Sequence, residues 1–259
     1  IRLAAQLTAS DDLQGLYLEM QPIMSLREPD QSLNFEVLLR MRDAAGERIP
    51  TPRLITAAEN SGRMGMIDRW VLRQTLAWMR EQQRQLSHTR FICMNLSGAS
   101  LNDESFLQDA VQLLQRYADV APRLCLEITE MVALAELGSS AGWIERLRRR
   151  GLRVALDDFG SGFASYAYLR HLPLDLLKID GTFVRGIERD PINRAMVGSM
   201  VQIARQLGLR TVAEFVESAA AQDCLRELGI DYAQGYFIGR PHPLAELADA
   251  LAAEPLLPR

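Results

Sequence analysis

Cysteine and histidine are scarce in this sequence, with three of each among 259 residues. The cysteines, Cys93, Cys125 and Cys224, show no CxxC spacing, and the histidines are scattered along the chain. Zinc sites are built mainly from closely spaced cysteine and histidine ligands. A zinc enzyme is therefore disfavoured. Because Cys93 and Cys125 lie within apolar runs, the cysteines are expected to be reduced residues of the core.

An excess of positive charge is also absent. The chain has 29 lysines and arginines against 33 acidic residues, a formal net charge of −4. Proteins that hold duplex nucleic acid by its phosphates usually carry a basic surface, so duplex binding is not expected. A small phosphorylated ligand needs only a local pocket. The arginines within residues 146–150 are interpreted as a solvated helix end, favoured by the helix dipole.

Long apolar runs are missing as well. No stretch approaches the roughly 18 residues that cross a bilayer, and the beginning of the chain lacks the pattern of a signal peptide. We expect a cytoplasmic domain with no membrane contact of its own, in a protein that could be tethered to a membrane elsewhere. Since the sequence starts at Ile1 without methionine, residues 1–15 are interpreted as a helical leader that links residues 16–259 to an upstream domain.

Short apolar segments with strand character alternate with longer segments of helical spacing, the pattern of repeated β-α units. The predicted strands cover residues 16–22, 33–41, 91–95, 123–127, 153–157, 174–180, 210–213 and 232–238. Two helices are predicted between 54 and 85, broken near Ser61 and Gly62, and others over 104–117, 141–150, 193–207 and 218–228. This order predicts an α/β fold closed into a (β/α)8 barrel. A doubly wound open sheet is the alternative, but neither GxGxxG after the first strand nor GxxxxGK[ST] occurs.

Polar residues gather where the predicted strands end. A single acid after a strand is commonly only a helix N-cap, but in a barrel these ends converge on the rim that holds catalytic groups. Like charges in one pocket raise each other's pKa, so such a cluster requires cations. Oxygen ligands select hard ions such as Mg²⁺ or Mn²⁺, and a set large enough for two metals points to phosphoryl displacement. The residues are Asn95, Glu127, Asp157, Asp158, Lys178, Asp180, Glu214 and Gln234.

These residues lie in motifs that resemble those of the EAL-type cyclic di-GMP phosphodiesterases, from about residue 16 to residue 244. The resemblance implies a modified TIM barrel whose first strand is antiparallel to its neighbours. It also implies hydrolysis of one phosphodiester bond of cyclic di-GMP to linear pGpG in bacterial second-messenger signalling. The motifs are Glu36-Val37-Leu38-Leu39-Arg40, Asn95-Leu96-Ser97, Glu127-Ile128-Thr129-Glu130, Asp157-Asp158-Phe159-Gly160-Ser161-Gly162, Lys178-Ile179-Asp180, Ala213-Glu214-Phe215-Val216-Glu217 and Gln234-Gly235-Tyr236.

The resemblance also implies which residues bind two Mg²⁺ or Mn²⁺ ions. Asp157 would bridge the ions, and Lys178 would orient or deprotonate the water that they activate. Glu36 would serve both as ligand and in catalysis. The first ion would be held by Glu36, Asn95, Glu127 and Asp157, and the second by Asp157, Asp158 and Glu214.

Further positions are assigned by the same resemblance. Arg40 would contact a substrate phosphate, Gln21 and Gln234 would lie near substrate and metal water, and Asp180 would lie near a guanine. Glu130 would hold the loop after residues 153–157 without binding metal; the alternative is that it merely begins the next helix.

Two departures and several partners follow from the resemblance. Val37 replaces an alanine and is expected to alter only packing, whereas Phe215 stands where the family usually has glycine and could disturb Glu214. Tyr236 could stack on substrate, but an aromatic residue in a strand is expected in the core. The resemblance also implies a homodimer and an upstream sensory or GGDEF domain.

The alternative function is a non-hydrolysing sensor of cyclic di-GMP. Degenerate members of the family are expected to lose ligand carboxylates, however, and this chain retains them.

Overall fold

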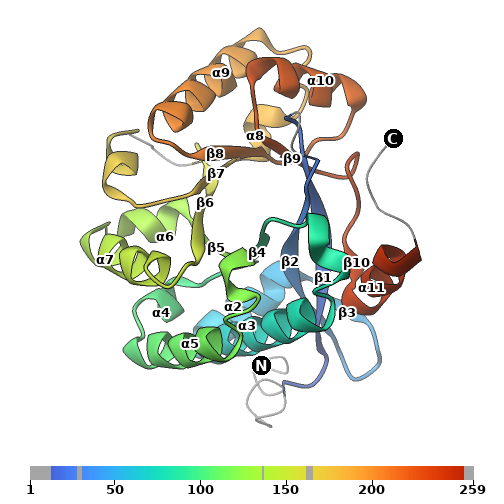
Figure 1. Cartoon of the computed structure of the whole chain (residues 1–259), viewed down its shortest axis with the longest axis vertical. Coiled ribbons are helices and arrows are strands. Elements are labelled where there is room, and N and C mark those ends of the chain that lie inside the picture. Colours follow the sequence, from blue (N-terminus) through green and yellow to red (C-terminus); the bar gives the residue numbers. More distant parts are fainter. Residues whose placement is uncertain (1–12, 28–30, 136, 162–165, 254–259) are drawn as a thin grey trace.

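The computed structural model describes residues 13–27, 31–135, 137–161 and 166–253. The predicted helical leader therefore lies outside the described residues, except for its last three, which make a turn before the first strand. Helices surround a ring of strands (Figure 1). The barrel strands are β1 (Leu16–Ser25), β2 (Leu33–Arg42), β4 (Ile92–Asn95), β5 (Leu124–Thr129), β6 (Arg153–Phe159), β7 (Leu176–Ile179), β8 (Arg210–Ala213) and β9 (Tyr232–Gln234).

The eight strands close into a barrel in which only β1 is reversed. They are hydrogen-bonded in the order β1-β9-β8-β7-β6-β5-β4-β2, and pairing of β2 with β1 completes the ring. Strand β1 is antiparallel to both β2 and β9, whereas the other neighbouring strands are parallel. The predicted modified TIM barrel is thus confirmed. Two short strands lie outside the ring, β3 (Arg48–Ile49) beside β2 and β10 (His242–Pro243) beside β1.

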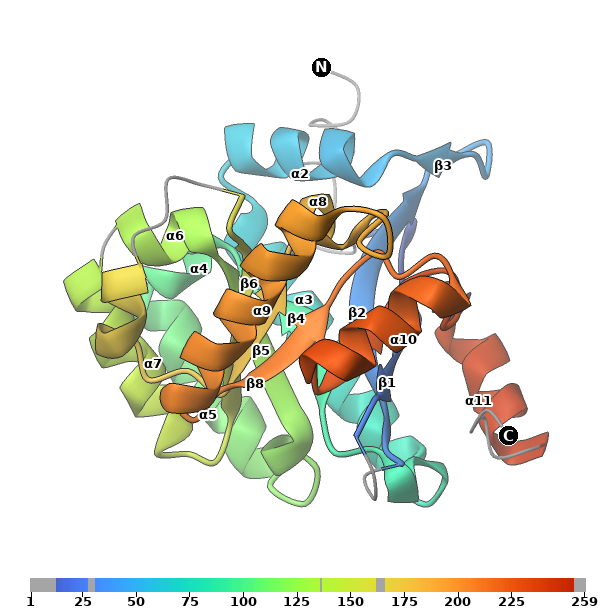
Figure 2. The same ribbon diagram turned by 90° about the horizontal axis from the view of Figure 1, so that it is seen from above.

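The helices cover the outside of the barrel and bury one apolar face each. The two helices predicted between 54 and 85 are separated at Gly62, whose φ of 64° favours glycine. Helix α9 packs against β8, and α10 lies beside α9 (Figure 2). The helices are α2 (Thr51–Asn60), α3 (Met64–Glu81), α4 (Gly98–Leu101), α5 (Glu104–Arg116), α6 (Glu130–Ala135), α7 (Leu137–Arg148), α8 (Gly181–Val184), α9 (Pro191–Gln206), α10 (Ala219–Leu228) and α11 (Leu244–Ala253), with 3₁₀ turns η1 (Gln85–His88), η2 (Ala121–Arg123) and η3 (Tyr166–His171).

The apolar core has two parts, because strand side chains alternate between the two faces of the sheet. The larger part fills the space between strands and helices. The smaller part lies inside the barrel and includes Cys93 and Cys125. All three cysteines are buried and free, as expected.

Strand direction gives the barrel two different ends. The carboxyl ends of the parallel strands share one rim. Strand β1 begins at this rim, since Leu16 pairs with Met41, and ends at the other, where Ser25 pairs with Tyr232. Within the described part of the chain, no helix has the length and apolarity needed to span a membrane.

Candidate functional site

Lys178 lies at the centre of a buried cluster of carboxylates inside the rim. Its side chain is 1% exposed, and strand β7 directs it into the barrel. Its Nζ atom lies 2.9 Å from Glu214 Oε1, 3.1 Å from Glu127 Oε2, 3.2 Å from Asp157 Oδ1 and 3.3 Å from Glu36 Oε2. Residues far apart in the sequence thus converge on one ammonium group.

Three amide side chains extend this cluster around Glu36. Asn95 Nδ2 donates to Glu36 Oε1 at 2.9 Å, and Gln234 Nε2 donates to Glu36 Oε2 at 2.6 Å. Gln234 Nε2 also lies 3.3 Å from Gln21 Oε1, while Gln21 Nε2 donates to the carbonyl of Gly239. The structure therefore brings Gln21, Glu36, Asn95 and Gln234 together.

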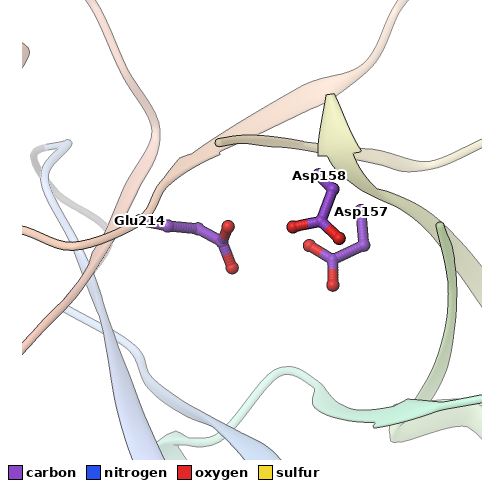
Figure 3. Close-up of side chains that lie close together, drawn as sticks. All are labelled: Asp157, Asp158 and Glu214. Carbon is purple, nitrogen blue, oxygen red and sulfur yellow. The ribbon is translucent and has the colours of Figure 1, made fainter. Parts of the chain in front are cut away.

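Asp157 and Asp158 both face the site although they are consecutive in β6. In a regular strand, consecutive side chains point to opposite faces of the sheet. Here the pairing of β6 with β7 shifts register between Leu156 and Phe159, and Asp158 adopts a φ of 54°. Figure 3 shows the two carboxylates side by side, with Glu214 reaching toward them from the opposite side. One oxygen from each of the three residues lies within 4.8 Å of the others.

The cluster holds more negative charge than its single lysine can neutralise. Burial would lower the pKa of Lys178, but Asp157 and the other carboxylates raise it well above its ordinary value. Burial raises the pKa of Glu127 well above its ordinary range, and it raises the pKa of Glu214 to about 8 in spite of Lys178. Burial and Asp157 also raise the pKa of Asp158. Such repulsion favours the binding of cations.

The oxygen atoms of the cluster suit divalent cations as ligands. Glu127 Oε1 and Gln234 Oε1 are buried and accept no hydrogen bond within the described residues, and Asp157 Oδ1 has only its ion pair with Lys178. A buried polar atom without a partner is costly, and both such oxygens belong to residues of this cluster. The atoms available as metal ligands are carboxylate and amide oxygens, which hard ions prefer. The residues present therefore fit a metal centre.

Arg40 lines the cavity beside this cluster and is held there by Glu19. The cavity has a volume of about 410 Å³, and Gln21, Glu36, Glu214 and Gln234 also line it. Arg40 Nε donates to the buried Glu19 Oε2 at 2.8 Å, and Arg48 Nη2 donates to the same oxygen at 3.0 Å. Sequence analysis did not identify Glu19, because its partner lies 21 residues away on the neighbouring strand.

Phe215 does not displace Glu214, because its ring turns outward. Its φ is 54°, which explains why glycine is usual at this position. The ring is 47% exposed, covers Gly181 closely and stacks against the guanidinium of Arg185 at 4.2 Å. Tyr236 was expected in the core, and this is wrong: it is 58% exposed and lines the cavity with Phe215 and Arg185.

Glu130 connects the carboxyl end of β5 to the segment that follows β6. Although it is the first residue of α6, its buried carboxylate accepts hydrogen bonds from Gly160 N at 3.1 Å and Tyr168 Oη at 2.7 Å. Glu130 therefore both begins α6 and contacts the segment after β6. Its catalytic importance stays a prediction, and residues 162–165 of the loop lie outside the described part.

Asp180 differs from the other predicted residues. It caps α8 by accepting a hydrogen bond from Thr182 N at 2.8 Å, and it does not line the cavity described above. Its proposed contact with a guanine stays a prediction.

Comparisons with known proteins agree with this architecture. A sequence model described as the EAL domain matches residues 4–241. Cyclic di-GMP phosphodiesterase PdeB of Shewanella oneidensis is 40% identical over 234 residues, which is 90% of this chain and 27% of that protein. Cyclic di-GMP phosphodiesterase PdeF of Escherichia coli is 37% identical over 230 residues, 89% of this chain and 30% of that protein. The chain thus spans under a third of the length of these relatives.

Solved structures match over nearly the whole barrel. The PaMucR phosphodiesterase in complex with c-di-GMP superposes with a TM-score of 0.87 at 30% identity, covering 95% of this chain and 100% of that one. The FimX EAL domain from Pseudomonas aeruginosa bound to c-di-GMP gives a TM-score of 0.84 at 28% identity, covering 92% of this chain and 96% of that one.

Proposed function

The chain belongs to the EAL domain family, and from this premise we propose that it hydrolyses one phosphodiester bond of cyclic di-GMP, giving linear pGpG. The observation that carries the proposal is the intact carboxylate cluster around Lys178, with oxygen atoms that lack partners. A domain that only binds the nucleotide does not need such a cluster. Hydrolysis with cation assistance does.

The residues proposed to hold two Mg²⁺ or Mn²⁺ ions form two overlapping sets. Asp157 belongs to both, since it lies next to Asp158 and within reach of Glu214. Bound divalent cations supply a water of lowered pKa and neutralise charge on the phosphoryl oxygens. The first set is Glu36, Asn95, Glu127 and Asp157, and the second is Asp157, Asp158 and Glu214.

Lys178 is proposed to hold and move a proton at Nζ. In the cluster as described, four carboxylates stabilise its ammonium form. Carboxylates engaged as metal ligands would stabilise the ammonium form less, and burial of Lys178 would then favour its neutral amine. A neutral amine can accept a proton from the attacking water, as a general base must.

The surrounding residues are proposed to position the substrate. Arg40 presents a planar guanidinium that suits a phosphate, and Glu19 fixes its orientation. Gln21 and Gln234 line the same cavity as Arg40 and can hydrogen-bond to substrate or water. Glu130 is proposed to keep the main chain after Asp158 in place.

Incubation of the purified chain with cyclic di-GMP tests this proposal. We expect pGpG in the presence of Mg²⁺ or Mn²⁺, and none in excess EDTA. Glu127→Gln is expected to lower turnover by roughly 10³-fold, because a ligand that stabilises transition-state charge is lost. Full activity in EDTA would contradict the metal assignment. Binding of cyclic di-GMP without hydrolysis under either metal would instead support the sensor function.

The homodimer, the upstream sensory or GGDEF domain and the cytoplasmic location remain predictions of the sequence. Measurement of the oligomeric state in solution tests the homodimer.

A further inference from the structure

A second cavity lies at the opposite end of the barrel from the carboxylate cluster. Its volume is about 500 Å³, within the range of small-molecule sites. It lies where the parallel strands begin, since Arg153, Leu176, Arg210 and Tyr232 are the first residues of β6, β7, β8 and β9. This cavity shares no lining residue with the cavity beside the carboxylate cluster.

The charge of this cavity is opposite to that of the chain. Five arginines line it, and the only carboxylate among its lining residues is Asp175. Asp175 is already engaged, because it forms a two-point ion pair with Arg148 at 2.9 and 3.2 Å and accepts from Val154 N at 2.9 Å. The chain as a whole has a net charge of −4. The arginines are Arg90, Arg148, Arg153, Arg170 and Arg210.

Helix dipoles do not account for this set. The carboxyl end of a helix carries roughly half a negative charge, which explains Arg148 in the last turn of α7. Arg153 and Arg210 begin strands, and Arg170 lies in η3. Helices α7 and α9 both end beside the cavity, but together they contribute about one negative charge. The positive charge of the five arginines exceeds this negative charge.

Two of the arginines have guanidinium groups available to a ligand. Within the described residues, Arg153 and Arg170 form no ion pair, and Arg153 donates to the main-chain carbonyl of Arg90. Between the arginines, the cavity is closed by the buried side chains of Phe91, Leu176 and Tyr232, whose two aromatic rings pack edge to face at 5.1 Å. The cavity thus combines several guanidinium donors with an apolar floor.

We propose that this cavity binds a small polyanion with two or more phosphate groups. A guanidinium offers paired N–H donors that match phosphate oxygens, and several arginines around one cavity suit several phosphates. The site goes beyond the proposed hydrolysis, because it is formed by different residues at the other end of the barrel. The ligand could be a nucleoside triphosphate or an inorganic polyphosphate, which share this chemistry.

Calorimetry with GTP and with inorganic tripolyphosphate tests the site. Titrations are made in EDTA, so that no metal ion can recruit phosphate to the carboxylate cluster, and at low ionic strength, because salt screens exposed charges. We expect binding of both probes. Tighter binding of GTP than of tripolyphosphate would support the site and indicate that the apolar floor holds the base. Equal binding would support the site and indicate that it recognises phosphate alone.

The double variant Arg153→Gln/Arg170→Gln is expected to weaken binding by roughly 100-fold, because each lost charged hydrogen bond costs about a factor of ten or more. The matched control, Arg149→Gln/Arg189→Gln, removes two exposed charges that do not line the cavity and is expected to change affinity less than about threefold. Equal weakening in both variants, or dissociation constants above about 1 mM for both probes, would overturn the proposal.

Discussion

The two ends of the barrel carry opposite charge and hold it in different ways. At the carboxyl ends of the strands, four buried carboxylates surround Lys178, and Asp158 lies beside Asp157. At the amino ends, arginines line an open cavity, and the nearby acids Asp175 and Asp231 are paired with arginines. The first end holds buried carboxylates in excess of its one lysine, whereas the second holds arginines in excess of its acids.

This difference shows where the fold accepts an energetic cost. Buried like charges are expensive, and they persist where chemistry requires them. The same end contains the only positive φ values of non-glycine residues in the described part of the chain, at Asp158 and Phe215. Backbone strain and electrostatic repulsion therefore coincide at the end proposed for catalysis, called the catalytic end below.

The largest expected difference between the two ends concerns turnover. Lys178→Ala is expected to lower kcat by roughly 10²-fold or more with little change in KM, because a proton-transfer group is lost. The control Arg149→Gln, which removes an exposed charge outside both cavities, is expected to leave kcat unchanged. Steady-state kinetics with cyclic di-GMP measure both. An effect of Lys178→Ala on KM alone would mean that the lysine positions substrate and is not the base.

Glu130 tests how far the catalytic end depends on its supporting contacts. Glu130→Ala removes the acceptor for Gly160 N and Tyr168 Oη and is expected to raise the Mg²⁺ concentration for half-maximal activity by about 10-fold or more. Glu130→Gln retains one acceptor oxygen and should show a smaller shift. An unchanged Mg²⁺ titration, with loss of thermal stability only, would favour the helix-start role.

Glu19 tests whether a charge pair at the catalytic end serves substrate binding. Glu19→Gln removes the negative charge that holds Arg40 and leaves at most a weaker neutral hydrogen bond, so KM is expected to rise about three- to tenfold with kcat nearly unchanged. Arg48→Gln is the control, since it removes the more exposed partner of Glu19 and leaves the pair with Arg40. Equal KM changes in the two variants would contradict a specific role for the Glu19–Arg40 pair.

The smallest expected effect is on thermal stability without metal. The pKa of Glu214 is about 8 in the folded chain, above its ordinary value of 4.5. Between these values the folded state keeps a proton that the unfolded state loses, so stability falls as pH rises from about 5 to 8. Melting in EDTA should show a Tm lower by several degrees at pH 8, since about 1 kcal/mol shifts Tm by roughly 2–4 °C at this size.

The arginine end contributes nothing to this slope, because guanidinium groups stay protonated throughout that range. In Glu214→Gln the decline of Tm with pH is expected to flatten. A Tm that rises with pH in the unmodified chain would show that Glu214 is ionised in the folded state.

The eight barrel strands and their order could be predicted from periodicity, but several details could not. The reversed direction of β1 was implied only by family resemblance, because alternation of side chains is the same in either direction. A single residue of shifted register brings Asp158 beside Asp157, and no pattern in the sequence announces that shift. Glu19 was missed because ion pairs across strands depend on register. Tyr236 was misplaced because β9 stops at Gln234, where Gly235 packs closely on the backbone of Val216.

The reversed β1 has a consequence for how this barrel is joined to the rest of a chain. In a barrel of uniformly parallel strands, the polypeptide enters the first strand at the end remote from catalysis. Here Leu16 begins beside Met41, at the carboxyl rim, so the preceding turn of residues 13–15 lies at the same end as the carboxylate cluster. A rotation or a pull applied through this junction would act directly on the strand that carries Glu19 and Gln21.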